Sequence, residues 1–282
     1  MSDADYRAYV AANSATFAEN SALEARYLDA QRDPSKWADF ETAANARNRA
    51  RGVGHLTVRK GSSLAADPHR ASVQQTGGVT TAAIAATATL TSNFISVSQE
   101  PEIYNNYCGP ATAVMMARAI GNTKSSLDSA PLAQANIAGY LQTGAPGGAG
   151  TPAGGLAGGL NDWIWGHGVP GGYAYIGATT SSSSQMLSRV KLDTDIGWSV
   201  GLNTVELSLA TSWRYNNHPN QGKKIFHFIA TYGYINSTIY FADPSAGSLG
   251  LPAFSAASPY AGDTRMWNFV NQSGSDSRGY TW

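Results

Sequence analysis

Cys108 is the single cysteine of this 282-residue chain, and it stands where a helix is expected to begin. The run YNNYCGPATAVMMARAIG puts a polar turn before the thiol, Gly109 and Pro110 directly after it, and apolar residues at helical spacing up to Gly121. A thiol in the first turn of a helix faces unpaired N–H groups and the positive end of the helix dipole, and both favour the nucleophilic thiolate. A lone cysteine is more often a small buried apolar residue. The turn-like surroundings of this one favour a reactive thiol.

A nucleophilic thiol needs a base, and the base needs a group that orients it. Of the histidines, His227 alone lies in a strand-like run, KKIFHFIATYGY. A second strand-like run, STIYFADP, follows after a short turn and ends at Asp243. Taken singly, His227 could be a hydrogen-bonded core histidine, and Asp243 could cap an Asp-Pro turn. Together the three residues predict a nucleophile on a helix and its two partners on adjacent strands.

The segments NNYCGPATAVMM, HFIATYGY and IYFADP resemble those of papain-like cysteine peptidases of the bacteriocin-leader-processing (double-glycine peptidase) type, in its soluble branch. The similarity spans roughly residues 91–282 and includes a Gly-rich loop before a helix (TPAGGLAGGLNDW) and a helix before a central strand (KLDTDIGWSVGLNTVE). It implies an α+β, papain-like fold in which the catalytic helix packs on an antiparallel sheet, behind a helical N-terminal region.

The same resemblance implies the roles of four site residues. Cys108 would be the nucleophile, His227 the base and Asp243 the orienting group. Gln99 would donate to the oxyanion, although a surface position is the alternative for this residue, which lies nine positions before the cysteine. The implied function is a cysteine peptidase that forms a thioester acyl-enzyme on a peptide or protein substrate, without a cofactor.

Two other functions stay open at the level of sequence. An amidase, transglutaminase or deamidase could use the same three groups, and a catalytically silent peptide-binding module could retain the fold. The Gly-rich run 144–159 either lines a narrow cleft or forms a surface loop. We expect His167 and His218 to be exposed in turns, and Trp163 and Trp165 to pack in the core rather than to wall the cleft.

Composition excludes several classes of protein. The formal net charge is zero and the pI is near 7.0, so the chain offers no electrostatic footprint for nucleic acid. No apolar run reaches membrane-spanning length, and we expect no membrane insertion. A single cysteine excludes an internal disulfide framework and a multi-thiolate zinc site, and the histidines form no HExxH motif. We therefore expect no metal.

Charge density divides the chain. Residues 1–60 hold nine Lys/Arg and eight Asp/Glu, whereas the much longer stretch 91–282 holds nine and ten. The first stretch has two helical patterns, the second of which starts after Asp33, a plausible cap, and places Trp37 and Phe40 on one side. The Ala/Thr/Ser/Gly-rich stretch 61–90 has no sustained periodicity and is predicted to be a linker.

The N-terminal helices have three interpretations. They could be a removable propeptide that contacts and occludes the cleft, a targeting or docking module, or an integral part of the fold. The propeptide interpretation gains from the linker that follows, where proteolysis would be easy. The low-charge, aromatic-rich composition of 91–282 favours a secreted bacterial enzyme whose signal peptide is absent from this sequence, with a cytoplasmic protein as the alternative.

Overall fold

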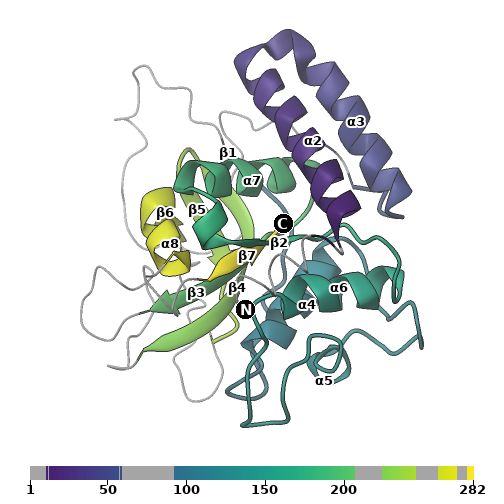
Figure 1. The fold of residues 1–282 in the computed structure, drawn as a ribbon, viewed down its shortest axis with the longest axis vertical. Coiled ribbons are helices and arrows are strands. Elements are labelled where there is room, and N and C mark those ends of the chain that lie inside the picture. The colour runs from purple at the N-terminus through teal and green to yellow at the C-terminus, as the bar shows by residue number, and fades with distance from the viewer. Residues whose placement is uncertain are drawn as a thin grey trace, which may run out of the picture.

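A computed structural model describes residues 11, 13–56, 58, 92–206, 224–245, 260–271 and 278–282. These residues form an antiparallel sheet with helices packed on it, and a pair of helices from the N-terminal region stands at one end of the molecule (Figure 1). No helix in these ranges combines the length and the apolar character of a membrane-spanning segment. The predicted linker, 61–90, lies outside the described residues.

The N-terminal region forms a helical hairpin. Helix α2 (Ser14–Arg32) is followed by the short 3₁₀ turn η1 (Pro34–Lys36) and by α3 (Trp37–Ala50). The predicted cap is present, because the Asp33 carboxylate accepts hydrogen bonds from the Ser35 amide and hydroxyl at 3.1 and 2.7 Å. Phe40 is fully buried and packs edge-on against Tyr27 of α2. The apolar side of each helix therefore faces the other helix and the rest of the protein.

The sheet runs β2-β7-β3-β4-β5-β6, with β1 paired to β4, and all of its pairings are antiparallel. Its strands are β1 (Ser92–Phe94), β2 (Tyr175–Gly177), β3 (Gly201–Glu206), β4 (Ile225–Ile235), β5 (Thr238–Ala242), β6 (Tyr260–Gly262) and β7 (Gly279–Thr281). The long strand β4 pairs with β1, β3 and β5 and is the centre of the sheet. It joins β5 through a two-residue turn in which Asn236 takes a positive φ of 51°.

Besides the N-terminal pair, the described residues form five α-helices around the sheet. They are α4 (Cys108–Ala119), α5 (Gln134–Ile137), α6 (Gly155–Trp165), α7 (Ser183–Ile196) and α8 (Asp263–Val270). In Figure 1, α4, α5 and α6 gather on one side of the central strands and α8 lies on the other. Helix α4 is the most deeply buried, since Ala111 to Ala117 are all fully inaccessible. A helix that is apolar around its whole circumference must be a core helix.

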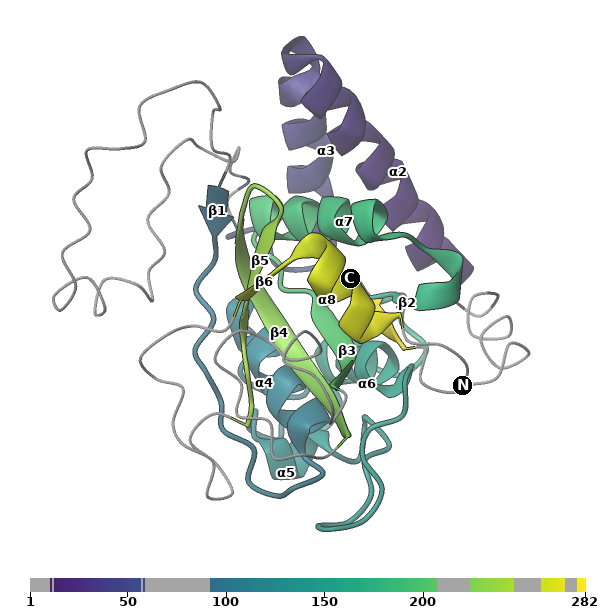
Figure 2. The ribbon, with the colours of Figure 1, turned by 90° about the vertical axis from the view of Figure 1, so that its left-hand side faces the viewer.

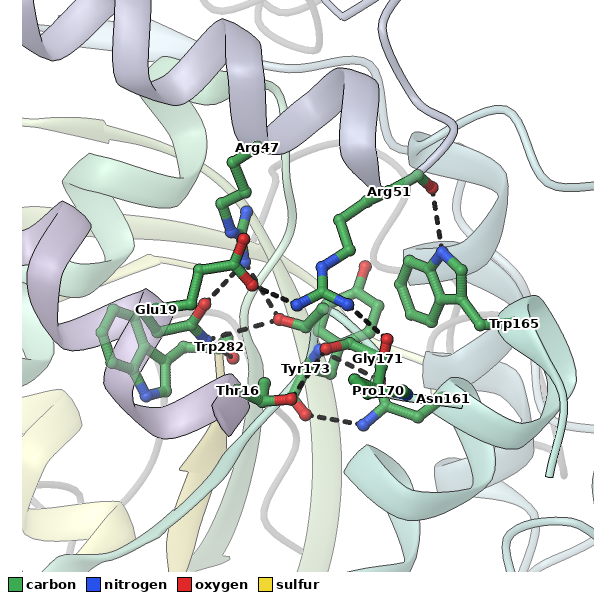
Figure 3. Close-up of polar contacts among 12 residues, drawn as sticks. Thr16, Glu19, Arg47, Arg51, Asn161, Trp165, Pro170, Gly171, Tyr173 and Trp282 are labelled. Carbon is green, nitrogen blue, oxygen red and sulfur yellow. Dashed lines mark hydrogen bonds and ion pairs between the residues drawn. The ribbon is translucent and has the colours of Figure 1, made fainter. Parts of the chain in front are cut away.

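The helical hairpin contacts the rest of the protein through buried polar groups. Thr16 donates to the Gly171 carbonyl at 2.9 Å, and Asn20 donates to the Trp282 carbonyl at 3.2 Å (Figure 3). The Arg47 guanidinium lies 4.3 Å from the Trp198 ring centroid. Such groups would be costly to bury without partners. The hairpin is therefore joined by specific contacts to the chain before β2, after α7 and after β7.

A second row of contacts extends this interface at the end of α3. Arg51 is ion-paired with Glu19 and donates to the Pro170 carbonyl, while its own carbonyl accepts from the Trp165 indole at 2.9 Å (Figure 3). Trp165 stacks in parallel on Trp198, with the ring centroids 6.0 Å apart. Trp163 is fully buried. Trp163 and Trp165 of α6 thus pack in the core and at the hairpin interface, as expected.

The predicted fold class is confirmed. The chain is α+β, the helix that begins at Cys108 packs on an antiparallel sheet, and a helical region precedes it. Seen from the side, α7 lies between the N-terminal hairpin and the sheet, and α5 lies at the opposite end of the molecule (Figure 2). This arrangement separates the hairpin contacts from the loop that leads into α4.

Candidate active site

Cys108 is the first residue of α4 and is 8% exposed. Gly109 allows the close approach of the following chain, since a Cβ at this position would lie 1.9 Å from the Thr151 hydroxyl oxygen. Pro110 follows in the first turn, where its missing N–H costs nothing. The turn predicted from sequence therefore places the thiol at a helix start, and the next residue, Gly109, lies against Thr151.

Sheet register brings His227 and Asp243 together. Ala230 of β4 lies opposite Ala242 of β5, so one further residue places Asp243 opposite Ile229. His227 lies two residues along β4 from Ile229, on the same face, and such diagonal neighbours are within side-chain reach. The ring Nε2 of His227 and Oδ1 of Asp243 are 2.6 Å apart, and the two residues are 4% and 0% exposed.

The Asp243 carboxylate is held from its other side by the turn that follows β5. Its Oδ1 also accepts from the Ser245 amide at 2.8 Å and from the Ser245 hydroxyl at 2.7 Å. This is the Asp-Pro turn capping expected as the simpler role of Asp243, and it exists together with the histidine contact. The turn fixes the carboxylate, and the carboxylate in turn fixes the imidazole.

Cys108 also lies beside the His227 ring. Its side chain is close enough to interact with the imidazole, whose Nε2 faces Asp243. Burial lowers the pKa of His227, but the Asp243 carboxylate and Cys108 raise it more, so that the pKa lies well above its ordinary value of 6.5. The arrangement therefore favours an imidazolium at neutral pH.

Gln99 lies beside this group. Its side-chain amide donates to the backbone carbonyl of Asp243 at 3.0 Å. The structure thus places Gln99 next to Asp243, and its role as an oxyanion donor stays a prediction.

Glu102 is a residue of this region that the sequence analysis did not single out. It is 7% exposed, and its amide donates to the Pro244 carbonyl at 2.9 Å. Burial raises the pKa of Glu102, the charge of His227 lowers it, and the charge of Asp243 raises it. Its Oε2 makes no hydrogen bond within the described part of the chain. The signal available in the sequence was only its place in the loop before Cys108.

His167 and His218 were both predicted to be exposed in turns. His167 is exposed, with Nδ1 2.8 Å from Oδ2 of Asp162, in agreement with the prediction of an exposed turn. His218 lies outside the described residues. Within the described ranges, no cluster of three or more His, Cys, Asp or Glu side chains could hold a metal ion. The Gly-rich run divides into an exposed loop and, from Gly155 onward, helix α6.

Comparisons with known proteins add little to this geometry. No protein-family model matches the chain, and no curated protein matches its sequence. Solved structures similar to it include a protein described as a C39-like peptidase from Bacillus anthracis. That chain has 14% sequence identity to this one and a TM-score of 0.40, and the alignment covers 67% of this chain and 96% of that one.

Proposed function

We propose that this protein is a cysteine peptidase of the papain-like type, in which Cys108 attacks, His227 transfers protons and Asp243 orients the imidazole. The observation that carries the proposal is the buried contact of His227 with both Asp243 and Cys108. One ring nitrogen, Nε2, contacts the carboxylate, and we assign the other, Nδ1, to the thiol. This is the order of groups that nucleophilic catalysis by a thiol requires.

The reaction follows from these positions. Nδ1 of His227 takes the proton of Cys108, and the thiolate attacks an amide carbonyl to give a tetrahedral intermediate. The backbone N–H of Cys108 and the side chain of Gln99 would stabilise the oxyanion. The imidazolium then protonates the leaving amine, which leaves a thioester, and His227 activates the water that hydrolyses it. The proposed chemistry uses no metal or cofactor.

The substrate class rests on the same proposal. The sequence resemblance to bacteriocin-leader-processing peptidases favours a peptide or protein substrate that lies extended beside Cys108. The low charge of residues 91–282 favours an extracellular enzyme. Deamidases, amidases and transglutaminases would share every step up to the thioester and differ in the acyl donor or acceptor.

Thiol titration followed by a peptide library tests the proposal. We expect iodoacetamide to label Cys108 stoichiometrically at about pH 5–6, where an unactivated thiol is protonated. We expect the wild-type protein to cleave library peptides and Cys108→Ser to cleave none while retaining the same melting temperature. Release of ammonia without backbone cleavage would instead indicate a deamidase or transglutaminase. Absence of labelling would indicate a silent binding module, and turnover by Cys108→Ser would end the proposal.

A further inference from the structure

One buried side chain in the loop before Cys108 holds an exposed Gly-rich loop. Asn106 is 8% exposed, and its amide nitrogen lies 3.3, 3.0 and 3.1 Å from the carbonyl oxygens of Gly144, Ala145 and Ala149. Its amide oxygen accepts from the Gly147 amide at 3.0 Å. Both polar atoms of a single asparagine are thus used on one loop, two residues before the proposed nucleophile.

The loop has few other means of holding its position. Residues 145–150 are all exposed, so no side chain among them is anchored in the core. Within the loop, the Gly144 amide donates to the Ala149 carbonyl and the Gly148 amide to the Ala145 carbonyl, at 2.9 and 2.8 Å. Gly147 takes a φ of +77°, a conformation that few other residues adopt. The loop is a closed turn, and Asn106 is its connection to the rest of the protein at the centre of that turn.

The end of the loop contacts the nucleophile turn directly. Thr151 packs against Gly109, and its hydroxyl is hydrogen-bonded to Thr143 at 2.7 Å, which closes the base of the loop. The chain on both sides of Cys108 therefore contacts one segment: Asn106 binds the turn, and Gly109 abuts its last residue. The segment therefore borders the turn that carries the sulfur on both sides of Cys108.

We propose that Asn106 is a positioning residue that holds residues 144–150 as the wall of the substrate cleft beside Cys108, and so sets the affinity for an extended peptide rather than the reactivity of the thiol. This inference rests on the proposed peptidase function. Glycines in the wall leave the backbone accessible to a substrate backbone. Loss of contacts that are equally strong in the bound substrate and in the transition state raises KM and leaves kcat unchanged.

The test compares Asn106→Asp with Asn105→Asp. The first change is isosteric, keeps an acceptor for the Gly147 amide, and turns a donor to three carbonyls into an oxygen that they repel. Asn105 is exposed and adjacent, so the second change adds the same charge without touching the loop. Hydrogen exchange of the peptide that spans 144–150, measured by mass spectrometry on the full chain, reports on the loop whether or not the protein is a peptidase.

Two thiol reagents then separate the cleft from the nucleophile. In Asn106→Asp we expect faster exchange in the loop, an unchanged rate with iodoacetamide, and a rate with a tripeptide chloromethyl ketone that is lower by roughly tenfold or more. For a cleaved library peptide, KM should rise while kcat stays within about twofold. Asn105→Asp should match the wild type in all of these measurements.

Each contrary result has a distinct meaning. Unchanged hydrogen exchange in Asn106→Asp would show that Asn106 does not hold the loop. Faster exchange with unchanged ketone reactivity would show that the loop is not part of the cleft, and equal loss with both reagents would place the effect on the thiol. Each of these results would overturn the inference. A wild-type protein that reacts with neither reagent would instead overturn the proposed function, and the exchange result would still decide the role of Asn106.

Discussion

The two ends of β4 each bury an aspartate against a polar side chain of that strand, and the two sites differ in what surrounds the carboxylate. At one end, Asp243 accepts from the imidazole of His227 and from Ser245. At the other end, Asp195 accepts from the hydroxyl groups of Tyr234 and Tyr27, both at 2.9 Å. It also accepts from the amide of Asn93 at 2.8 Å. His227 and Tyr234 are seven residues apart, which is roughly 23 Å along a strand.

The difference lies in whether a partner of the carboxylate can change its charge. Burial and the Asp195 charge raise the pKa of Tyr27 well above 10, and burial raises that of Tyr234 too, so both remain neutral donors. The raised pKa of His227 instead favours a charged partner at neutral pH. A buried aspartate therefore joins the N-terminal hairpin to the sheet at one end, and another holds the proposed catalytic imidazole at the other. These contacts favour the interpretation of the hairpin as an integral part of the fold.

Among the substitutions that distinguish the two ends of β4, Asp243→Asn should have the largest effect on activity. Burial lowers the pKa of His227, and the Asp243 charge raises it. Without the carboxylate the pKa of His227 therefore falls, and the ring loses its fixed orientation. We expect kcat/KM for a cleaved peptide to fall by roughly a hundred- to ten-thousandfold, and the alkaline limb of the pH profile to move to lower pH. Ser245→Ala, which removes one donor but leaves the carboxylate, is the control. Activity within tenfold of the wild type at every pH would contradict this role.

The same pair has a consequence for stability. The folded pKa of His227 is raised above 6.5, so its contribution to the free energy of unfolding is complete below that value and is lost as pH rises through the folded pKa. Asp243→Asn should therefore lose stability relative to the wild type at low pH more than at high pH. Thermal unfolding at several pH values provides this measurement.

At the other end, Asp195→Asn should change stability rather than activity. Burial raises the pKa of Asp195 to about 6, and hydrogen bonds from its three neutral partners lower it only in part. A raised carboxyl pKa gives a contribution that is complete below about pH 4 and is lost as pH rises through about 6. From well below pH 4 to well above pH 6, the wild type should lose about 3 kcal/mol more of its unfolding free energy than the variant.

Denaturant titrations from acid to neutral pH, on both proteins, measure this difference in slope. The variant should still lose unfolding free energy as pH rises, because Asp193 remains. Burial raises the pKa of Asp193 to about 7, although the charges of Arg47 and Arg189 lower it in part. Asp162→Asn, a surface change of the same kind, should leave the slope of the wild type. Equal slopes for Asp195→Asn and the wild type, or a loss of peptidase activity in the variant, would contradict the separation of the two ends.

The placement of Cys108, His227 and Asp243 on their elements could be predicted from sequence because the signals are local. Cys108 precedes a Gly-Pro turn and an apolar helical pattern, and His227 lies in an alternating strand. Asp243 ends the next strand after a short turn. Each signal spans only a few residues, and sheet register then brings the side chains together.

The other end of β4, where Asp195 joins the hairpin to the sheet, had no such local signal. Tyr27, Asn93, Asp195 and Tyr234 come from four separate elements, and nothing in the chain near any of them indicates the other three. Glu102 and Asn106 were also missed as site residues for this reason. Their burial depends on contacts with Pro244 and with the 144–150 loop, which are distant in sequence.

Tyr27→Phe tests the docking contact with the smallest change of shape. The variant removes one donor from the Asp195 carboxylate, and loss of such a buried hydrogen bond costs about 1–3 kcal/mol. We expect a larger cost near pH 8 than near pH 4, because a hydrogen bond to a charged acceptor is stronger. Denaturant unfolding at both pH values measures the cost. Tyr104→Phe, at an exposed tyrosine, should cost little, and unchanged stability of Tyr27→Phe would contradict the role of the contact.

Glu102→Gln should give the smallest changes in stability and in activity. Glu102 resembles the groups at both ends of β4. Glu102 lies at the catalytic end, yet like Asp195 it is a carboxyl whose pKa is raised by burial. Its contribution to stability is therefore complete below its ordinary value of 4.5 and is lost as pH rises through the folded pKa. The variant should be more stable than the wild type at about pH 8, by roughly 1–3 °C in melting temperature, and should lose that advantage at about pH 4.

Its activity should change in the opposite sense. Ionised Glu102 favours the imidazolium of His227, so the variant should move the alkaline limb of the pH profile to lower pH by less than about one unit. Glu100→Gln is the matched control, because Glu100 is in the same loop but lies nearer the surface, paired with Arg118 at 3.1 Å. A stability gain that does not grow with pH would show that Glu102 is not penalised when ionised. An unmoved limb would show that its charge does not reach His227, and the catalytic end would then depend on Asp243 and Cys108 alone.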